Sequence, residues 1–434
     1  MIAISKKNSL RANKILLSLF NVEAVVDGLE EAKKDNFLNN LHKEIKAPDG
    51  RAYYLTCKNL KKFLSLIEIV QHALPESSVL DSWNVEKSCR TVLGEMYGEG
   101  NLGVDVQQFL SSVQEVTKSV IKSHRFYTCL VGLDFDGFDQ MVVGKMLIQT
   151  ADLDFLKSCD ATTEVINSTW KRMGRGLWIS TEITGSFEYA EGVFFERTKL
   201  LCGLLSIAFA SVFQPNGWSI RLSPNIEGSF KPGTASWFSF PTETKVLNLS
   251  SSMLDLHCFT LSNEHKTNLL NCYWFQCLTK IIQSKAEDDA GQAVKRAVFW
   301  FYDAQNDSAI EMRLVKYWSC IECFFSFEND GRTTDKIIRG MLTILTYGRH
   351  QFSSPEKWKA LERDINRLYS LRSRAVHDAK HNHVSWSDVN MISKWAAWVL
   401  LEVAQLITNG FKTRLSIKNE IDRVYELCLS RDSK

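Results

Sequence analysis

The chain has 434 residues, of which 45% are hydrophobic and 24% are charged, and its formal net charge at pH 7 is +2. These values are typical of a soluble globular protein of two or three domains, and the balanced charge neither indicates nor excludes a nucleic-acid partner. No stretch of eighteen consecutive apolar residues occurs, and the first residues do not resemble a secretion signal, so no membrane association is expected. Eleven cysteines without a pairing rhythm predict reduced thiols and a cytoplasmic location.

The first two thirds of the sequence predict helices followed by a mixed region. Residues 1–123 are expected to be mainly helical, as in the amphipathic stretch 59–75. From about residue 124, short runs rich in β-branched and aromatic residues are bounded by turn residues, which is typical of strands. Strands are expected at 125–137, 140–150, 176–190, 217–224, 235–240 and 244–250. A long apolar helix at 191–213 is expected to pack on them, which makes 124–285 an α+β region.

After about residue 285 the strand patterns stop and amphipathic helices follow one another. Helices are expected at 288–305, 308–327, 334–348, 354–378, 386–410 and 413–429. Ser354 is a predicted N-cap with Pro355 at the first helical position, and the fifth helix is expected to start near Ser387 and to stop at Gly410. Short connections between such helices predict an all-α bundle over residues 290–434.

The helix at 354–378 has an arginine where its pattern requires an apolar residue. Its apolar stripe, at spacings of three and four, is formed by Trp358, Leu361, Ile365 and Leu368, and continues to Arg372 and Ala375. An unpaired buried guanidinium is costly, so the fold must offer Arg372 a partner, and Glu322 on the helix at 308–327 is one candidate. His377 follows five residues later. Between residues 332 and 380 there are 11 basic and 5 acidic residues, which creates a moderate positive field.

Two other patterns are better explained by structure than by chemistry. Asp134, Asp136 and Asp139 resemble a calcium loop, but such a loop needs glycine at its sixth position and glutamate at its twelfth, where Asp139 and Lys145 stand. A hairpin turn between two strands is therefore expected. Cys320 and Cys323 form a C-x-x-C inside an apolar helical run without a second cysteine pair, which favours core packing over zinc, and Cys272 and Cys277 follow the same interpretation.

The histidines require separate consideration. His377, His381 and His383 could hold a metal, but no nearby carboxylate or cysteine completes a ligand set. The spacing of Arg372 and His377 is by itself a weak pattern, since chance supplies roughly 0.4 occurrences in a chain of this composition. Spacing alone leaves open a buried Arg372–Glu322 bridge without any chemistry.

The stretch 367–380 resembles the hallmark of the HEPN superfamily, most closely its Apea-like branch. Members of that branch typically have a tyrosine, then Arg-Ser, then a hydrophobic residue directly before a histidine. Those positions are occupied here by Tyr369, Arg372, Ser373, Val376 and His377. The helices before it, with Glu322, are similar to the second and third helices of that family, and the resemblance covers residues 290 to 430. Two positions depart from the usual pattern: many nucleolytic members have Asn, Asp or His where Ser373 stands, and glycine where Asp378 stands.

The resemblance implies a metal-independent RNA endonuclease in which a homodimer of HEPN-like bundles brings Arg372 and His377 together as catalytic residues. Ser373, Glu322 and Tyr369 would support them, and no metal or other cofactor is expected. Similar architectures occur in anti-phage and toxin proteins, so residues 1–285 would sense or regulate, in response to an antitoxin or a phage-derived trigger. The alternative is a non-catalytic HEPN module for dimerisation or RNA binding.

Overall fold

The structure is a computed structural model that describes residues 2, 4–20, 25–27, 44–100, 105–213, 220–227, 229, 234–239, 248–253, 258–284, 288–325, 333–377 and 383–432. The chain divides into two compact units, the first formed by residues 1–125 and 182–194 and the second by residues 126–181 and 195–434. Residues of the predicted α+β region and of the predicted bundle both belong to the second unit. The division into three domains, 1–123, 124–285 and 290–434, stays a prediction.

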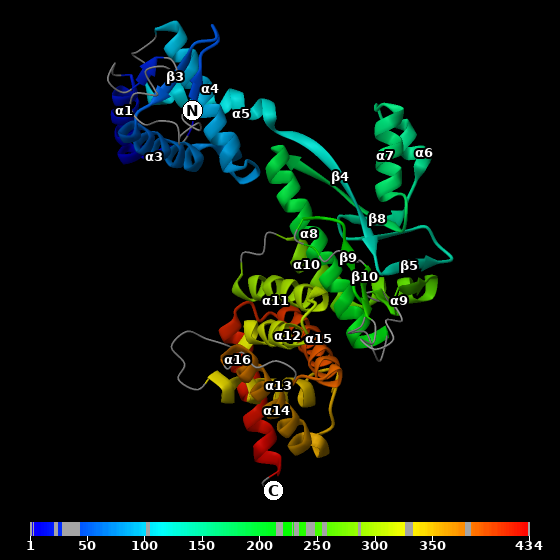
Figure 1. The fold of residues 1–434 in the computed structure, drawn as a ribbon. Helices are drawn as coiled ribbons and strands as arrows, with labels where there is room; N and C mark the ends of the chain where they lie inside the picture. Colours follow the sequence, from blue (N-terminus) through cyan, green and yellow to red (C-terminus); the bar gives the residue numbers. More distant parts are fainter. Residues whose placement is uncertain are drawn as a thin grey trace. The chain divides into compact units, whose positions relative to one another are not determined.

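The first unit is mainly helical, as predicted (Figure 1). Its helices are α1 (Lys6–Leu19), α3 (Cys57–Ala73), α4 (Ser82–Glu99) and α5 (Val106–Val120). They enclose a core that includes Leu16, Phe63, Leu66, Val85 and Phe109. A small antiparallel sheet, in the order β1 (Val25–Asp27), β3 (Ala52–Leu55) and β2 (Glu44–Lys46), accompanies them. The sequence did not predict this sheet, because strands of three or four residues are too short to show a clear alternation.

A five-stranded sheet follows in the order β6-β7-β8-β4-β9. Its strands are β4 (Lys122–Val131), β6 (Gln140–Val143), β7 (Met146–Thr150), β8 (Leu177–Gly185) and β9 (Ser223–Pro224). Two smaller pairings accompany it: β10 (Thr234–Ser239) is antiparallel to β11 (Asn248–Met253), and β5 (Leu133–Asp136) is parallel to β12 (Phe259–Ser262). The strands predicted from the sequence are therefore largely present, and the α+β character of this region is confirmed.

Several predicted boundaries in this region were wrong. The strand expected at 176–190 ends at Gly185, because residues from Phe187 onward begin helix α8 (Phe187–Ala208). Of the strand expected at 217–224, the described part contains only the two residues of β9. Four helices were not predicted: α6 (Leu153–Ser158), α7 (Thr163–Met173), α9 (Asn263–Asn271) and α10 (Tyr273–Gln283). Neither α6 nor α7 has a buried residue, so a core-facing stripe could not reveal them.

The turn at Asp134–Asp139 connects two different sheets rather than forming a hairpin. β5 pairs with β12, whereas β6 pairs with β7. The chain leaves the five-stranded sheet at Gly132, which has φ +95° and whose added Cβ would lie 2.0 Å from the carbonyl oxygen of Arg221. Only glycine fits this close approach with a positive φ. The aspartates thus mark a change of sheet.

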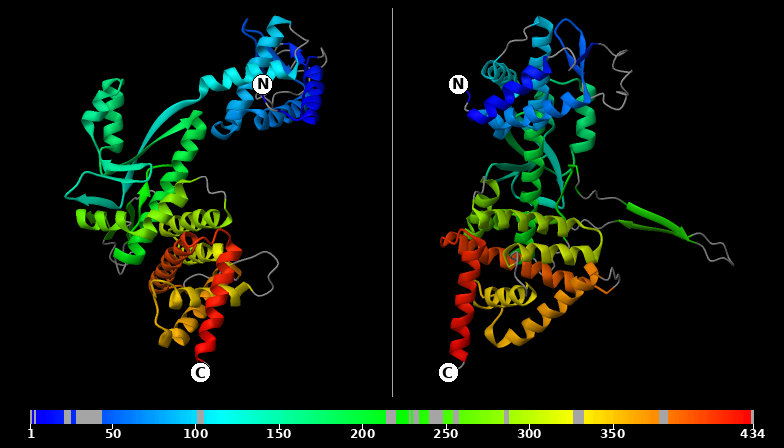
Figure 2. Two further views of the ribbon diagram at one scale, coloured as in Figure 1. Left: turned by 180° about the vertical axis from the view of Figure 1, so that it is seen from behind. Right: turned by 90° about the vertical axis from the view of Figure 1, so that its left-hand side faces the viewer.

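The C-terminal part is a helical bundle, as predicted (Figures 1 and 2). Its helices are α11 (Asp289–Asn306), α12 (Ile310–Phe325), α13 (Thr333–Tyr347), α14 (Trp358–His377), α15 (Trp386–Thr408) and α16 (Arg414–Asp432). α12 packs against α11, α14 and α15, and α13 packs against α14 and α16. The bundle core includes Phe301, Tyr317, Trp318, Phe324, Leu368 and Leu400. α12 is therefore the central helix, and it contacts the helix that carries Arg372.

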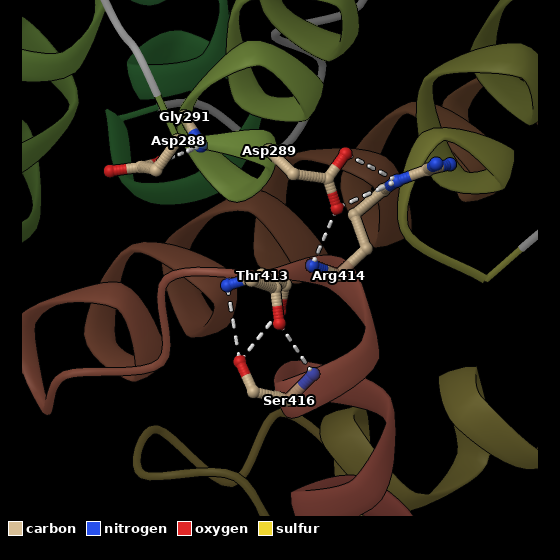
Figure 3. Close-up of polar contacts among 6 residues, drawn as sticks. All are labelled: Asp288, Asp289, Gly291, Thr413, Arg414 and Ser416. Carbon is tan, nitrogen blue, oxygen red and sulfur yellow. Dashed lines mark hydrogen bonds and ion pairs between the residues drawn. The ribbon is translucent and has the colours of Figure 1, made fainter.

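The starts of α11 and α16 are held together by a charged contact (Figure 3). The Asp289 carboxylate accepts hydrogen bonds from the backbone N–H of Arg414 at 2.9 Å and from its Nε at 3.0 Å. Beside it, Asp288 caps α11 through the N–H of Gly291, at 2.6 Å. Thr413 and Ser416 exchange backbone-to-hydroxyl hydrogen bonds that cap α16. The last helix is thereby fixed to the first helix of the bundle.

The ends of α14 and α15 agree with one expectation and correct another. α15 begins at Trp386, next to the start expected near Ser387, and its N-cap Ser385 forms a capping box with Asp388. Ser354 precedes a short 3₁₀ turn, Pro355–Lys357, without a side-chain cap, and α14 itself starts at Trp358. Asp388 is buried and also accepts a hydrogen bond from Nη1 of Arg367 at 2.6 Å. This carboxylate joins the two helices.

By length and composition α15 could cross a membrane, although two thirds of its apolar window (67%) is buried inside the protein. A core helix has the same composition, so this helix is weak evidence about membranes.

Replacing Asp388 by alanine should lower the free energy of unfolding by about 1–3 kcal/mol, because Arg367 and the N-terminus of α15 lose their acceptor. Burial raises the pKa of Asp388, but hydrogen bonds from Ser385 and Arg367 outweigh it and leave that pKa lowered. Because the pKa is lower in the folded state, the Asp388 carboxylate stabilises the fold at pH values above the unfolded pKa of about 3.9. This contribution is lost as the pH falls through the folded pKa. Urea unfolding at pH 7 and below pH 4 should therefore show a difference from wild type that shrinks in acid.

Asp364→Ala is the matched control on α14, because Asp364 has no ion pair among the described residues. An Asp388→Ala protein no less stable than this control at pH 7 would contradict the assigned role.

Candidate active site

Helix α14 directs one face into the bundle core and carries Arg372 at the edge of that face. Leu361, Ile365, Leu368 and Leu371 are buried along it. Arg372 follows on the next turn, but its side chain keeps 20% of its surface exposed. The prediction that the arginine points into the core interior is corrected in this respect. It lies at the core margin, where a charged group can meet both protein and solvent.

Arg372 is paired with Glu322 of α12, as the sequence predicted. Its Nη2 lies 3.2 Å from Oε2 of Glu322, whose side chain is 18% exposed. The Nε of Arg372 is buried and has no hydrogen-bond partner among the described residues. A guanidinium has five N–H donors, so the bond to Glu322 uses only one of them.

Burial dominates the electrostatics of Glu322. It raises the pKa of that carboxyl, and the attraction and hydrogen bond of Arg372 only partly offset the effect. The free-energy cost of removing two charges from water can exceed the energy of their mutual attraction. Such a pair is therefore a weak source of stability. The pair is therefore better explained by positioning the guanidinium than by holding the bundle together.

Aromatic rings surround the pair on one side. Tyr369, half-buried one turn before Arg372, lies edge-to-face against Trp318 with centroids 5.2 Å apart and planes at 90°. The guanidinium carbon of Arg372 is 5.8 Å from the centroid of the Tyr369 ring, within range of a cation–π contact. Sequence reasoning missed Trp318, although it lies four residues before Glu322 and so on the same face of α12.

His377 is the last residue of α14 and is exposed. In a helix, positions five apart are separated by about 7.5 Å along the axis and by about 140° around it. Within the described residues no contact joins His377 to Arg372. The fold therefore brings Arg372, Glu322 and Tyr369 together, with half-buried Ser373 beside them, and leaves His377 facing solvent at the helix end.

After the C-terminal end of α14, the segment that begins at His383 runs back alongside this helix. Nε2 of His383 is 3.4 Å from the carbonyl oxygen of Leu371, and Asp388 meets Arg367 one turn further back. Asp378 and His381 lie outside the described residues. Sequence reasoning considered His383 only as a metal ligand and did not place it beside the Arg372 turn, because the direction of the returning chain is set by the Arg367–Asp388 contact.

Metal and thiol chemistry find no support in the described part of the chain. No group of three His, Cys, Asp or Glu side chains that could hold a metal occurs there. Cys320 is buried and Cys323 half-buried in α12, consistent with the predicted core packing. Burial raises the pKa of Cys323 to about 11, which disfavours the thiolate needed for a nucleophile or a zinc ligand. Cys272 and Cys277 are both half-buried.

Comparison with known proteins does not identify the chain. No protein-family model matches the sequence, and no match was found among the curated proteins or the solved structures.

Glu322→Gln should change the pH dependence of stability in a defined direction. The raised folded pKa means that the contribution of Glu322 is fully present below the unfolded pKa of about 4.3 and is lost as the pH rises through the folded value. The stability of wild type relative to Glu322→Gln should therefore fall between pH 4 and pH 7. Thermal unfolding of both proteins across this pH range measures their relative stability. A stability of wild type relative to Glu322→Gln that rises with pH would contradict the burial of this carboxylate.

Proposed function

We propose that this protein is a metal-independent RNA endonuclease of the HEPN type, acting in the cytoplasm in anti-phage defence or as a toxin. The observation that carries the proposal is the Arg372–Glu322 pair at the margin of a helical bundle, on the helix that ends in the exposed His377. The all-α C-terminal bundle is also what the HEPN resemblance implies. Residues 1–285 would then sense a phage-derived trigger or bind an antitoxin.

The two side chains suit RNA cleavage without a metal. Neutral His377 can take the proton of a 2′-hydroxyl, and protonated His377 can donate to the leaving 5′-oxygen. Arg372 can bind the scissile phosphate and stabilise the charge that develops on it, while Glu322 fixes the direction of the guanidinium. Exposure of His377 and the partial exposure of Arg372 leave both accessible to a polymer.

A homodimer is part of the proposal, because one chain separates the two groups. Two copies of α14 related by a twofold axis would place two arginines and two histidines around one cleft. The excess of basic residues between positions 332 and 380 would be doubled there, which favours binding of a polyanion.

The rival proposal is a non-catalytic module for dimerisation or RNA binding. It is favoured by the same ion pair, since Glu322 already satisfies part of Arg372 without any substrate.

Purified protein should cleave total RNA in the presence of EDTA and leave DNA of matching sequence intact. The reason is that the proposed nucleophile is the ribose 2′-hydroxyl, and the proposed catalytic groups are side chains. Gel analysis of both substrates measures this. Cleavage that requires a divalent metal, or equal cutting of DNA, would exclude the mechanism.

His377→Ala should abolish RNA cleavage with little change in melting temperature, because the imidazole is exposed at a helix end. Arg372→Ala should also abolish cleavage and should cost about 1–3 kcal/mol of stability, since Glu322 loses its partner in a partly exposed site. Arg423→Ala, exposed on α16, and His265→Ala, exposed on α9, are the matched controls and should stay active. If wild type has no activity and Arg372→Ala changes only stability, the rival module is the better account.

A mixed dimer of Arg372→Ala and His377→Ala chains should regain part of the activity, although each homodimer is inactive. Only the mixed dimer combines an intact arginine of one chain with an intact histidine of the other in one site. Co-purification of two differently tagged chains, followed by an RNA cleavage assay, provides the measurement. An assembled mixed dimer without activity, or a fully active monomer, would show that the site is not shared.

A further inference from the structure

The first unit contains a basic groove between α1 and α3, which are neighbours in Figure 1. It has a volume of about 970 Å³. Among the described residues, six cationic side chains and no acidic side chain line it: Lys6, Lys7, Arg11, Lys14, Lys61 and Lys62. In the part of the chain that the structure describes, none of these six forms an ion pair. Within these described residues, then, no salt bridge neutralises the six charges, and an external anion can contact them.

The placement of two of these cations, Lys6 and Lys7, opposes the stability of the helix that carries them. The first turns of α1 and α3 contain no acidic residue. Lys6 and Lys7 lie in the first turn of α1, where the helix dipole favours negative charge and disfavours positive charge. A sequence selected only for helix stability would place acids there. The arrangement is therefore better explained by binding than by folding.

The residues that line the groove extend far enough along α1 to contact a linear polymer. Its α1 wall runs from Lys6 to Ser18, about 18 Å at a rise of 1.5 Å per residue. Lys7, Arg11 and Lys14 repeat along one side of α1 at spacings of four and three, so that positive charge recurs at each turn. Lys61 and Lys62 of α3 form the opposite wall. A row of cations on one wall and a pair on the other fits repeated negative charges along a strand better than a single small anion.

We propose that this groove binds the phosphate backbone of single-stranded RNA, a choice of polyanion that rests on the proposed function. Lysine and arginine are the usual partners of phosphate oxygens, and Ser65, which also lines the groove, can donate from its hydroxyl. No aromatic residue among those described lines the groove, so the proposal involves no stacking of bases and predicts binding that is independent of sequence. Leu10 and Ile15 supply an apolar surface for the sugars.

An anionic membrane is the main competing partner. Leu10, Leu17 and Leu64 are exposed on the same two helices, and leucines beside lysines suit a lipid surface. A flat bilayer reaches the outermost side chains of a surface, however, whereas the cations here line both walls of a groove. The geometry favours a strand.

The test is fluorescence anisotropy of the full chain with labelled single-stranded 2′-O-methyl RNA. This probe keeps the backbone charge but cannot be cut by 2′-hydroxyl attack, so the result is independent of the proposed ribonuclease activity. Lys61→Gln/Lys62→Gln and Lys7→Gln/Arg11→Gln/Lys14→Gln each neutralise one wall. Lys87→Gln/Lys122→Gln is the control, because both lysines are exposed on the same unit outside the groove.

Both groove variants should bind more weakly than wild type and should show a shallower dependence of affinity on salt. Each lost phosphate contact reduces the slope of log K against log[salt] by about 0.7 for a single strand, so the two-residue variant should lose about 1.4. Melting temperatures identify any variant that fails to fold, in which case the variant of the other wall decides. Unchanged affinity and slope in the folded groove variants would overturn the proposal. It would equally be overturned if the substitutions abolished binding to phosphatidylserine vesicles or to poly-glutamate while binding to the RNA stayed the same.

Discussion

The ion pair between Arg372 and Glu322 is the constraint on which the candidate site depends. It connects α12, the central helix of the bundle, to α14 at the margin of the core. Burial raises the pKa of Glu322 even with the arginine beside it. A pair whose desolvation is not fully offset adds little to stability but fixes direction, because each partner is held by the other and by packed neighbours. Trp318 and Tyr369 supply that packing.

The contacts around α14 determine what its C-terminal end presents. Arg367 is fixed to the buried Asp388, which starts α15, and His383 comes back beside the carbonyl of Leu371. The Asp289–Arg414 contact holds the last helix to the first. With these helices fixed, the end of α14 exposes His377 while its preceding turn is anchored. An anchored arginine and an accessible histidine on the same helix are the two groups that the proposed acid–base chemistry needs, and in that proposal a second copy of α14 brings them together.

Much of the bundle was predictable because each helix has an apolar stripe that faces one core. The six helices after residue 288 were all expected, and the partner of Arg372 followed from the cost of leaving a guanidinium unpaired. The missed features lack such a pattern. α6 and α7 bury no residue, and β9 is only two residues long. The burial of Arg372 was overestimated. The apolar stripe of a helix gives the direction of a side chain but not how far the side chain lies from the edge of the core.

The same limit applies to the candidate sites. Residues five apart on α14 can be placed by helical geometry, but the return of the chain to Leu371 depends on a tertiary contact with Asp388. The groove between α1 and α3 depends on two segments about fifty residues apart in the sequence, whose lysines look like ordinary solvated faces when taken separately. Only their packing shows that the cations share one concave surface.

The central claim is that Arg372 and His377 act on RNA through attack by the ribose 2′-hydroxyl. The chemistry of the cut ends tests it most directly, because it records the nucleophile independently of rates or cellular effects. RNA cleaved by the purified protein should carry 5′-hydroxyl and 2′,3′-cyclic phosphate ends, detected by mass spectrometry of the fragments. Fragments with 5′-phosphate and 3′-hydroxyl ends would mean that water or a metal-bound hydroxide is the nucleophile, and would contradict the mechanism.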